Sequence, residues 1–163
     1  MNGMIATVFY VGRIPLAPGT LGSLVALPLA WLLHYLGGFP ALGLASLAIF
    51  LLGWWATASY TRGRDNHDPG EVVIDEVVGQ WIALFPLSAG LWHAGVAGHV
   101  FPYPGWVGAF VMFRLFDIWK PWPVSWADRK HGPMGVMLDD VLAGLMAAVV
   151  VAAAAAVAHG MLM

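Results

Sequence analysis

Charged side chains are confined to two short parts of this sequence. Every Lys, Arg, Asp and Glu except Arg13 lies at residues 62–76 or 114–140. The rest is almost continuously apolar, and 60% of the chain is hydrophobic. Uncharged stretches of this length leave too little polar surface for a soluble domain, so we expect lipid to cover them. The two charged windows then indicate a site at a membrane.

Length and composition narrow the classes further. The 163 residues predict a single domain over residues 1–163. Charged residues make up 10% of the chain, against about 25% in soluble domains. A net charge of −2 argues against a nucleic-acid partner. The absence of cysteine excludes disulfides, thiolate metal sites and a cysteine nucleophile.

Five apolar segments predict the fold class, and no strand-like alternation competes with them. We expect an all-α, membrane-embedded helical bundle with about five hydrophobic helices, some short or re-entrant. Pro86 interrupts the third segment, and the fourth carries Arg114 and Asp117. The segments are residues 24–36, 39–60, 77–92, 106–119 and 141–158.

The positions of Lys and Arg predict an orientation. They precede the first segment and follow the second and fourth, whereas the loops at residues 37–38 and 93–105 have none. Because cytoplasmic loops retain Lys and Arg, we expect a multi-pass protein of the cell (inner) membrane with both charged windows at the cytoplasmic face.

The first candidate site element is the glycine-rich sequence APGTLGS at residues 17–23. Gly19 and Gly22 let a backbone approach an anion, and Thr20 and Ser23 add hydroxyl donors at the start of an apolar helix. A simple turn with a serine cap is the alternative, and the loop lacks the lysine of a nucleotide-binding P-loop.

Two acid pairs border apolar runs and form the second element. Residues 65–79 contain five carboxylates, of which Asp75 and Glu76 stand between valines and isoleucine; His67 is a weaker candidate in this segment. Asp139 and Asp140 repeat the pattern, so two helix starts could present facing acids. Such carboxylates suit Mg²⁺, which binds oxygen ligands together with phosphate and water. Capping of helix N-termini by acids is the alternative.

A basic stretch forms the third element. Arg114, Asp117 and Lys120 follow one another at i, i+3 steps and share a helical face that Pro121 ends. Cations near a helix C-terminus also complement its dipole, which is the alternative explanation. The apolar neighbours of these side chains favour binding of an anionic group.

Four ordered motifs resemble the phosphatidylglycerophosphatase A family over most of the chain. They are PGTLGS at 18–23, VIDEVVG at 73–79 after Asp68-Pro69, FRLFDIWKPWP at 113–123, and Asp128-Arg129 followed by Gly135-Val136-Met137 and Asp139-Asp140. The resemblance implies an all-helical, Mg²⁺-dependent, membrane-bound lipid phosphatase that acts on phosphatidylglycerophosphate and has its site in these motifs. One departure is Gly132-Pro133, where the resemblance leads us to expect two glycines.

The residues and the resemblance together give a hypothesis for the mechanism. Metal ions at Asp75, Glu76, Asp139 and Asp140 would polarise the phosphate monoester and activate water. Arg114, Lys120 and Arg129 would stabilise phosphoryl oxygens. Asp117 and Asp128 remain either further ligands or an acid and a base, and the loop at residues 19–23 would bind phosphate.

Two other classes fit the sequence less well. Carboxylates within membrane segments also mark ion or proton transporters, but here the second and fifth segments contain hardly any polar group. A phosphoalcohol transferase would use similar carboxylates, but it needs an acceptor site that the sequence does not show.

Overall fold

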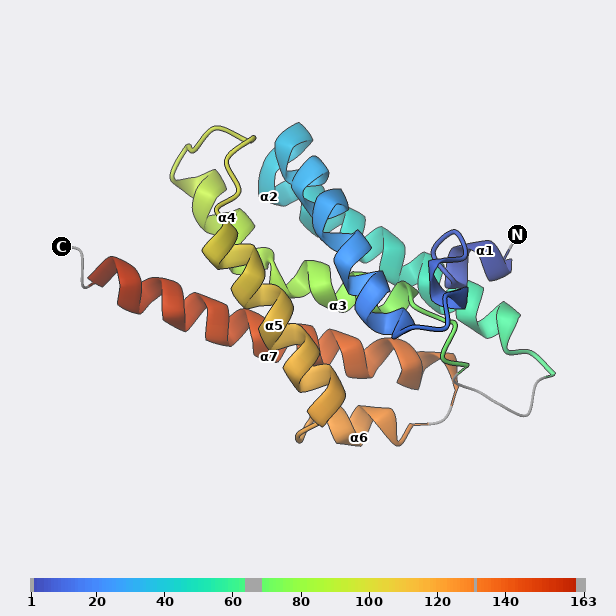
Figure 1. Ribbon diagram of the computed structural model, residues 1–163. Coiled ribbons are helices and arrows are strands. Elements are labelled where there is room, and N and C mark those ends of the chain that lie inside the picture. The colour runs from blue at the N-terminus through green and yellow to red at the C-terminus, as the bar shows by residue number, and fades with distance from the viewer. Residues whose placement is uncertain (1, 64–68, 131, 161–163) are drawn as a thin grey trace.

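The computed structural model describes residues 2–63, 69–130 and 132–160, and this part of the chain is helical without a strand (Figure 1). The expectation of an all-α fold is therefore confirmed. The elements are α1 (Asn2–Ala6), η1 (Val11–Arg13), α2 (Pro18–Tyr60), α3 (Ile74–Ala83), α4 (Phe85–His93), α5 (Tyr103–Trp119), α6 (Val124–Asp128) and α7 (Pro133–Gly160).

Helix α2 turns back on itself at two glycines. Gly37 has φ −156° and ψ 19°, and Gly38 has φ 63° and ψ −155°, so neither is helical. Gly38 is in a region that residues with a side chain rarely occupy, and the ring of Trp92 packs directly against it. The two limbs, residues 18–36 and 39–60, are each about 30 Å long, close to the thickness of a bilayer core. The predicted boundary between the first two segments is confirmed.

Helix α3 lies at the centre of the bundle. It contacts α2, α5 and α7, and every residue in it except Glu76 is buried. Its ten residues extend only about 15 Å, which is too short to cross a bilayer. The predicted segment 77–92 is therefore two short helices joined at Leu84. Pro86 explains the break, because its ring is incompatible with continuing the helix through this position.

Two described helices are long and apolar enough to cross a membrane, α2 and residues Pro133–Ala158 of α7. Only 17% and 22% of their most apolar stretches are buried, so most of this apolar surface needs lipid to cover it. The fold is a membrane-type helical bundle, and the number of five crossings stays a prediction.

The uncharged loops meet at one end of the molecule. A Cβ atom on Gly98 would lie 3.1 Å from the carbonyl oxygen of Tyr35, so the loop before α5 packs beside the turn of α2, as Figure 1 shows at the top of the molecule. His34 is buried there, and its Nδ1 lies 2.8 Å from Ser88 Oγ. The start of α2, the start of α3 and the end of α5 lie at the opposite end.

Candidate active site

Two glycines set the distance between α3 and α7. A Cβ atom on Gly144 would lie 2.4 Å from the carbonyl oxygen of Gly79, and one on Gly79 would lie 2.7 Å from the carbonyl oxygen of Asp140. Both distances are shorter than van der Waals contact. Only residues without a side chain therefore let the backbones approach this closely, and the crossing places Asp140 opposite the first turn of α3.

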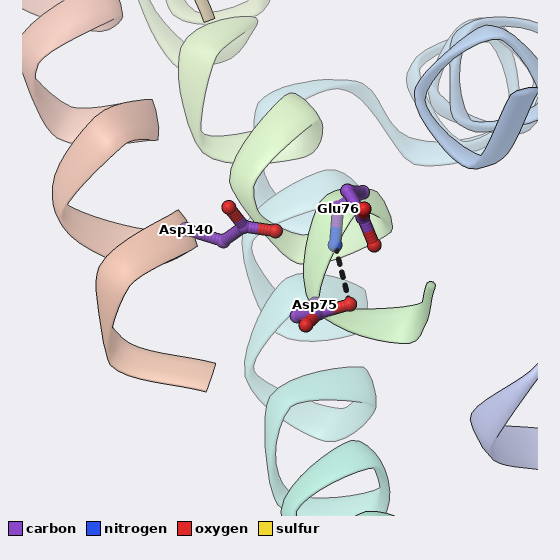
Figure 2. Close-up of side chains that lie close together, drawn as sticks. All are labelled: Asp75, Glu76 and Asp140. Carbon is purple, nitrogen blue, oxygen red and sulfur yellow. Dashed lines mark hydrogen bonds between the residues drawn. The ribbon is translucent and has the colours of Figure 1, made fainter. Parts of the chain in front are cut away.

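Three carboxylates face one another at this crossing (Figure 2). Asp75 and Glu76 come from α3 and Asp140 from α7, and each offers an oxygen within 4.8 Å of the others. The backbone N–H of Glu76 donates to Asp75 Oδ1 over 3.1 Å. Asp75 and Asp140 are buried, with exposed fractions of 7% and 3%. The acid pairs predicted to face each other therefore do so through these three residues.

The fourth predicted ligand, Asp139, is held by a cation. Its Oδ2 accepts a hydrogen bond of 2.7 Å from Lys120 Nζ, and the same ammonium group pairs with Asp128. The position also differs from the prediction that two acids open a helix. Helix α7 begins at Pro133, which suits a first turn because its missing N–H needs no partner there. Asp139 and Asp140 thus lie in the second turn.

Helix α5 supplies the basic side of the site. Arg114 Nη1 donates to Asp117 Oδ2 over 2.5 Å, which confirms that these side chains share a face. Helix α5 ends at Trp119, and Lys120 has a left-handed backbone with φ 48°, so its side chain leaves the helix and reaches α6 and α7. The predicted end of the helix before Pro121 is confirmed.

The start of α2 touches both kinds of charge. A Cβ atom on Gly19 would lie 2.1 Å from Glu76 Oε1 and 3.2 Å from Arg114 Nη1. The first turn of a helix leaves backbone N–H groups without intrahelical partners, and the positive end of its dipole points in the same direction. The glycine-rich sequence predicted as a loop is helical from Pro18 onward, so the prediction of a loop is wrong. The first turn of α2 still lies against the charged site, as an anion-binding role requires.

Burial raises the pKa of the α3 acids. Desolvation raises the pKa of Asp75 well above its usual value, and the neighbouring carboxyls of Glu76, Asp140 and Asp139 raise it further. Burial also raises the pKa of Glu76 and outweighs the lowering by Asp75 and Arg114. Burial alone would lower the pKa of Lys120, but its hydrogen bonds to Asp128 and Asp139 raise it instead. The lysine is a permanent cation, whereas among the described residues only acids act on the pKa of Asp75.

The charge balance and the unpartnered atoms fit a divalent cation. The site combines six carboxylates with only two bases, and Glu76 Oε2 and Asp139 Oδ1 are buried without a hydrogen-bond partner in the described structure. Buried anionic oxygens without partners are costly unless a cation binds them. Oxygen ligands of this type suit Mg²⁺. The residues are Asp75, Glu76, Asp117, Asp128, Asp139 and Asp140, with Arg114 and Lys120.

The other predicted phosphate ligands are less central. Thr20 is partly exposed, whereas Gly22 is buried and packs on Val73. The hydroxyl of Ser23 is buried and donates to the carbonyl of Gly19 over 2.9 Å, so it is used within its own helix. Arg129 is exposed at the end of α6. Their phosphate-binding roles stay predictions, and His67 lies outside the described residues.

The sequence reasoning missed Gln80. Its side chain is fully buried, and neither of its amide atoms has a hydrogen-bond partner among the described residues. It lies one helical turn after Glu76, so it shares that residue's face of α3. The signal that could have found it is that Gln80 is the amide side chain in an otherwise apolar run, four residues after the acid Glu76.

Comparison with known proteins shows which family this is. The family model described as Phosphatidylglycerophosphatase A matches residues 4–155. The chain belongs to this family. Phosphatidylglycerophosphatase A of Escherichia coli K12 is 38% identical over 89% of the chain and 78% of its own length. The Haemophilus influenzae Rd protein of the same name is 36% identical over 91% of the chain and 85% of its own length.

A third relative of the chain carries a different name. A Bacteroides thetaiotaomicron VPI-5482 protein, named as a candidate phosphatidylinositol-3-phosphatase, is 38% identical over 93% of the chain and 91% of its own length. No solved structure gives a significant match. Family membership confirms the resemblance seen in the motifs and identifies the chain as a phosphatase, a phosphoric monoester hydrolase.

Proposed function

We propose that this protein removes the terminal phosphate of phosphatidylglycerophosphate in a Mg²⁺-dependent reaction, giving phosphatidylglycerol and inorganic phosphate. The two relatives named phosphatidylglycerophosphatase A support this choice of substrate. The observation that carries the chemistry is the group of Asp75, Glu76 and Asp140, whose oxygens lie within 4.8 Å of one another beside two bases and a helix N-terminus.

Asp75, Glu76 and Asp140 would hold Mg²⁺, with Asp139 next to them as a further ligand. Bound there, the ion would polarise the phosphoryl group and lower the pKa of water. The unpartnered oxygens of Glu76 and Asp139 are available without breaking a hydrogen bond. Ionised carboxylates are the form that binds a cation, so metal binding and deprotonation of Asp75 would occur together.

The bases would bind the phosphoryl oxygens. Arg114 can offer a planar pair of N–H donors, and its Nε has no partner in the described structure. Lys120 would act as a point charge. The backbone of Gly19 lies within contact of Arg114, so the N–H groups of the first α2 turn, with Thr20, would bind a phosphate oxygen from the other side.

Hydrolysis also needs a base and an acid. A water oxygen bonds to phosphorus while the bond from phosphorus to the glycerol oxygen breaks, so the water loses a proton and the glycerol oxygen gains one. Asp117 and Asp128 are the candidates. Side-chain exposures of 13% for Asp117 and 41% for Asp128 make Asp128 the group that can exchange protons with solvent.

We place this site at the cytoplasmic face of the cell (inner) membrane in a multi-pass protein. The support is the gathering of Lys and Arg at the end of the bundle that holds the site, because cytoplasmic segments retain these residues. The headgroup would enter the charged site there while the apolar part of the lipid stays in the bilayer.

Phosphate release by the detergent-purified protein tests the proposal. Asp75→Asn and Asp139→Asn remove charge but keep shape, and Glu71→Gln is the matched control, because this carboxylate pairs with Tyr60 and Arg13. We expect release that requires Mg²⁺ and falls at least about 100-fold in the two site variants only. Activity in EDTA, or equal activity in all variants, would contradict the metal site.

A comparison of lipids in the same assay tests the substrate. Phosphatidylinositol 3-phosphate is the informative alternative because of the Bacteroides relative's name, and phosphatidic acid tests for a general monoesterase. Faster hydrolysis of phosphatidylglycerophosphate than of either supports the assignment, and a preference for the inositol lipid would replace it.

A further inference from the structure

A separate apolar cavity lies between the first limb of α2 and the beginning of α5. Its volume is about 450 Å³, within the range of small-molecule sites. Apart from His99, the residues that line it are apolar. It is lined mainly by Leu24, Leu27, Pro28 and Trp31 of α2, Phe101 of the preceding loop and Trp106 of α5.

The cavity, from here on called the α2–α5 groove, and the charged site lie along the same two helices. Gly19 lies against Arg114 at one end, whereas Trp31 and Trp106 line the cavity together, so α2 and α5 run antiparallel. At 1.5 Å per residue, the cavity begins about 8 Å beyond Gly19, at Leu24, and reaches about 18 Å beyond it, at Trp31. A ligand with a charged head and an apolar tail matches this order.

The far wall of the cavity is fixed by contacts of Trp31. Its indole Nε1 donates to the carbonyl of His99 over 3.2 Å, and its ring stacks on Tyr35 with centroids 5.8 Å apart. The loop before α5 therefore closes the groove at the end away from the charges. A wall held in this way gives the cavity a defined shape, unlike a smooth helix surface that faces lipid.

We propose that this α2–α5 groove binds one fatty acyl chain of the lipid substrate, with the chain running from Gly19 toward Trp31. The proposal rests on the lipid phosphatase function above. In a bilayer the chain is already in an apolar environment, so the groove contributes packing and position more than hydrophobic transfer. Its effect is to hold the phosphate against Arg114 and the acids, where small displacements change rates strongly.

Two substitutions fill the groove. Leu27→Trp narrows its middle, and Leu24→Trp, at a residue that is 44% exposed, narrows its entrance with little demand on the core. Leu29→Trp is the matched control, because Leu29 is 40% exposed on the same limb but does not line the cavity. Leu47→Trp controls for a second apolar hollow, which lies along the other limb of α2.

Rates are compared for dioleoyl and dihexanoyl phosphatidylglycerophosphate in the same mixed micelles, with Mg²⁺. The wild type should prefer the dioleoyl lipid. Leu27→Trp and Leu24→Trp should reduce this preference about tenfold while keeping the dihexanoyl rate, and both controls should leave it unchanged.

The outcomes separate the two proposals. If the wild type hydrolyses neither lipid, the phosphatase function fails. The acyl-chain proposal is wrong if the wild type hydrolyses both lipids but the groove variants prefer the dioleoyl lipid as strongly as Leu29→Trp does. It is also wrong if Leu47→Trp alone lowers the preference for the dioleoyl lipid. In both cases the phosphatase function stands.

Discussion

Substituting Gly19 by alanine tests whether the start of α2 positions the acids of α3. The new Cβ atom would lie 2.1 Å from Glu76 Oε1, and contacts below about 3 Å do not occur between such atoms. The carboxylate must therefore move by about 1 Å. A displacement of this size at a catalytic group can reduce the rate about 100-fold, which corresponds to about 2.7 kcal/mol of transition-state stabilisation.

The assay is Mg²⁺-dependent phosphate release, measured together with thermal unfolding of each purified variant. Gly43→Ala is the matched control, because Gly43 is also in α2 but has no neighbouring atom within 4 Å of the new Cβ in the described structure. Alanine favours a helix by up to about 1 kcal/mol over glycine, so neither variant should unfold more easily for backbone reasons. We expect loss of activity in Gly19→Ala with its fold intact. Activity within about twofold of Gly43→Ala would refute the argument that Gly19 determines the position of Glu76.

Two further predictions concern the helix crossing and the buried acid. Gly144→Ala should lower the free energy of unfolding by about 1–3 kcal/mol, because its Cβ meets the backbone of Gly79 at 2.4 Å. Gly108→Ala should leave the free energy of unfolding unchanged, because its Cβ meets nothing within 4 Å in the described structure. Equal melting temperatures of the two variants would contradict the close crossing. In EDTA the protein should lose stability as pH rises above about 4, because the raised pKa of Asp75 makes the native state retain a proton that the unfolded chain releases. Added Mg²⁺ should stabilise the protein more at about pH 8 than at about pH 5, and Asp75→Asn should reduce both effects in thermal melts.

The apolar segments were predictable because each depends on local sequence. Two glycines between uncharged runs indicated the turn of α2, and Pro86 indicated the break before α4. The burial of α3 was not predictable, since an apolar run of this kind is equally suited to lipid and to the interior of a bundle. The packing of α2, α5 and α7 around α3 places it in the interior.

The site was predictable in its residue types and less so in its pairings. Acids in apolar surroundings indicated Asp75, Glu76 and Asp140, but nothing local distinguished Asp139 from its neighbour. Its attachment to Lys120 depends on the left-handed residue at the end of α5 and on the rotation of α7 about its axis. That rotation is set where Gly79 meets Gly144, a contact between distant parts of the chain.

The length of α7 has a consequence for the energy of catalysis at a membrane. Its 28 residues extend about 42 Å, roughly 12 Å more than a bilayer core. That excess is about eight residues. The acidic residues of α7 lie within its first eight residues, 133–140, and the rest of the helix carries no Asp, Glu, Lys or Arg, so the excess falls at this end. Asp139 and Asp140 would then stand at the depth of the lipid headgroups. Drawing a phospholipid out into water costs about 0.8 kcal/mol for each methylene exposed, which exceeds 20 kcal/mol for two long chains. An enzyme whose acidic site residues lie at headgroup depth needs no lipid-extraction step, and its product can diffuse away in the plane of the membrane.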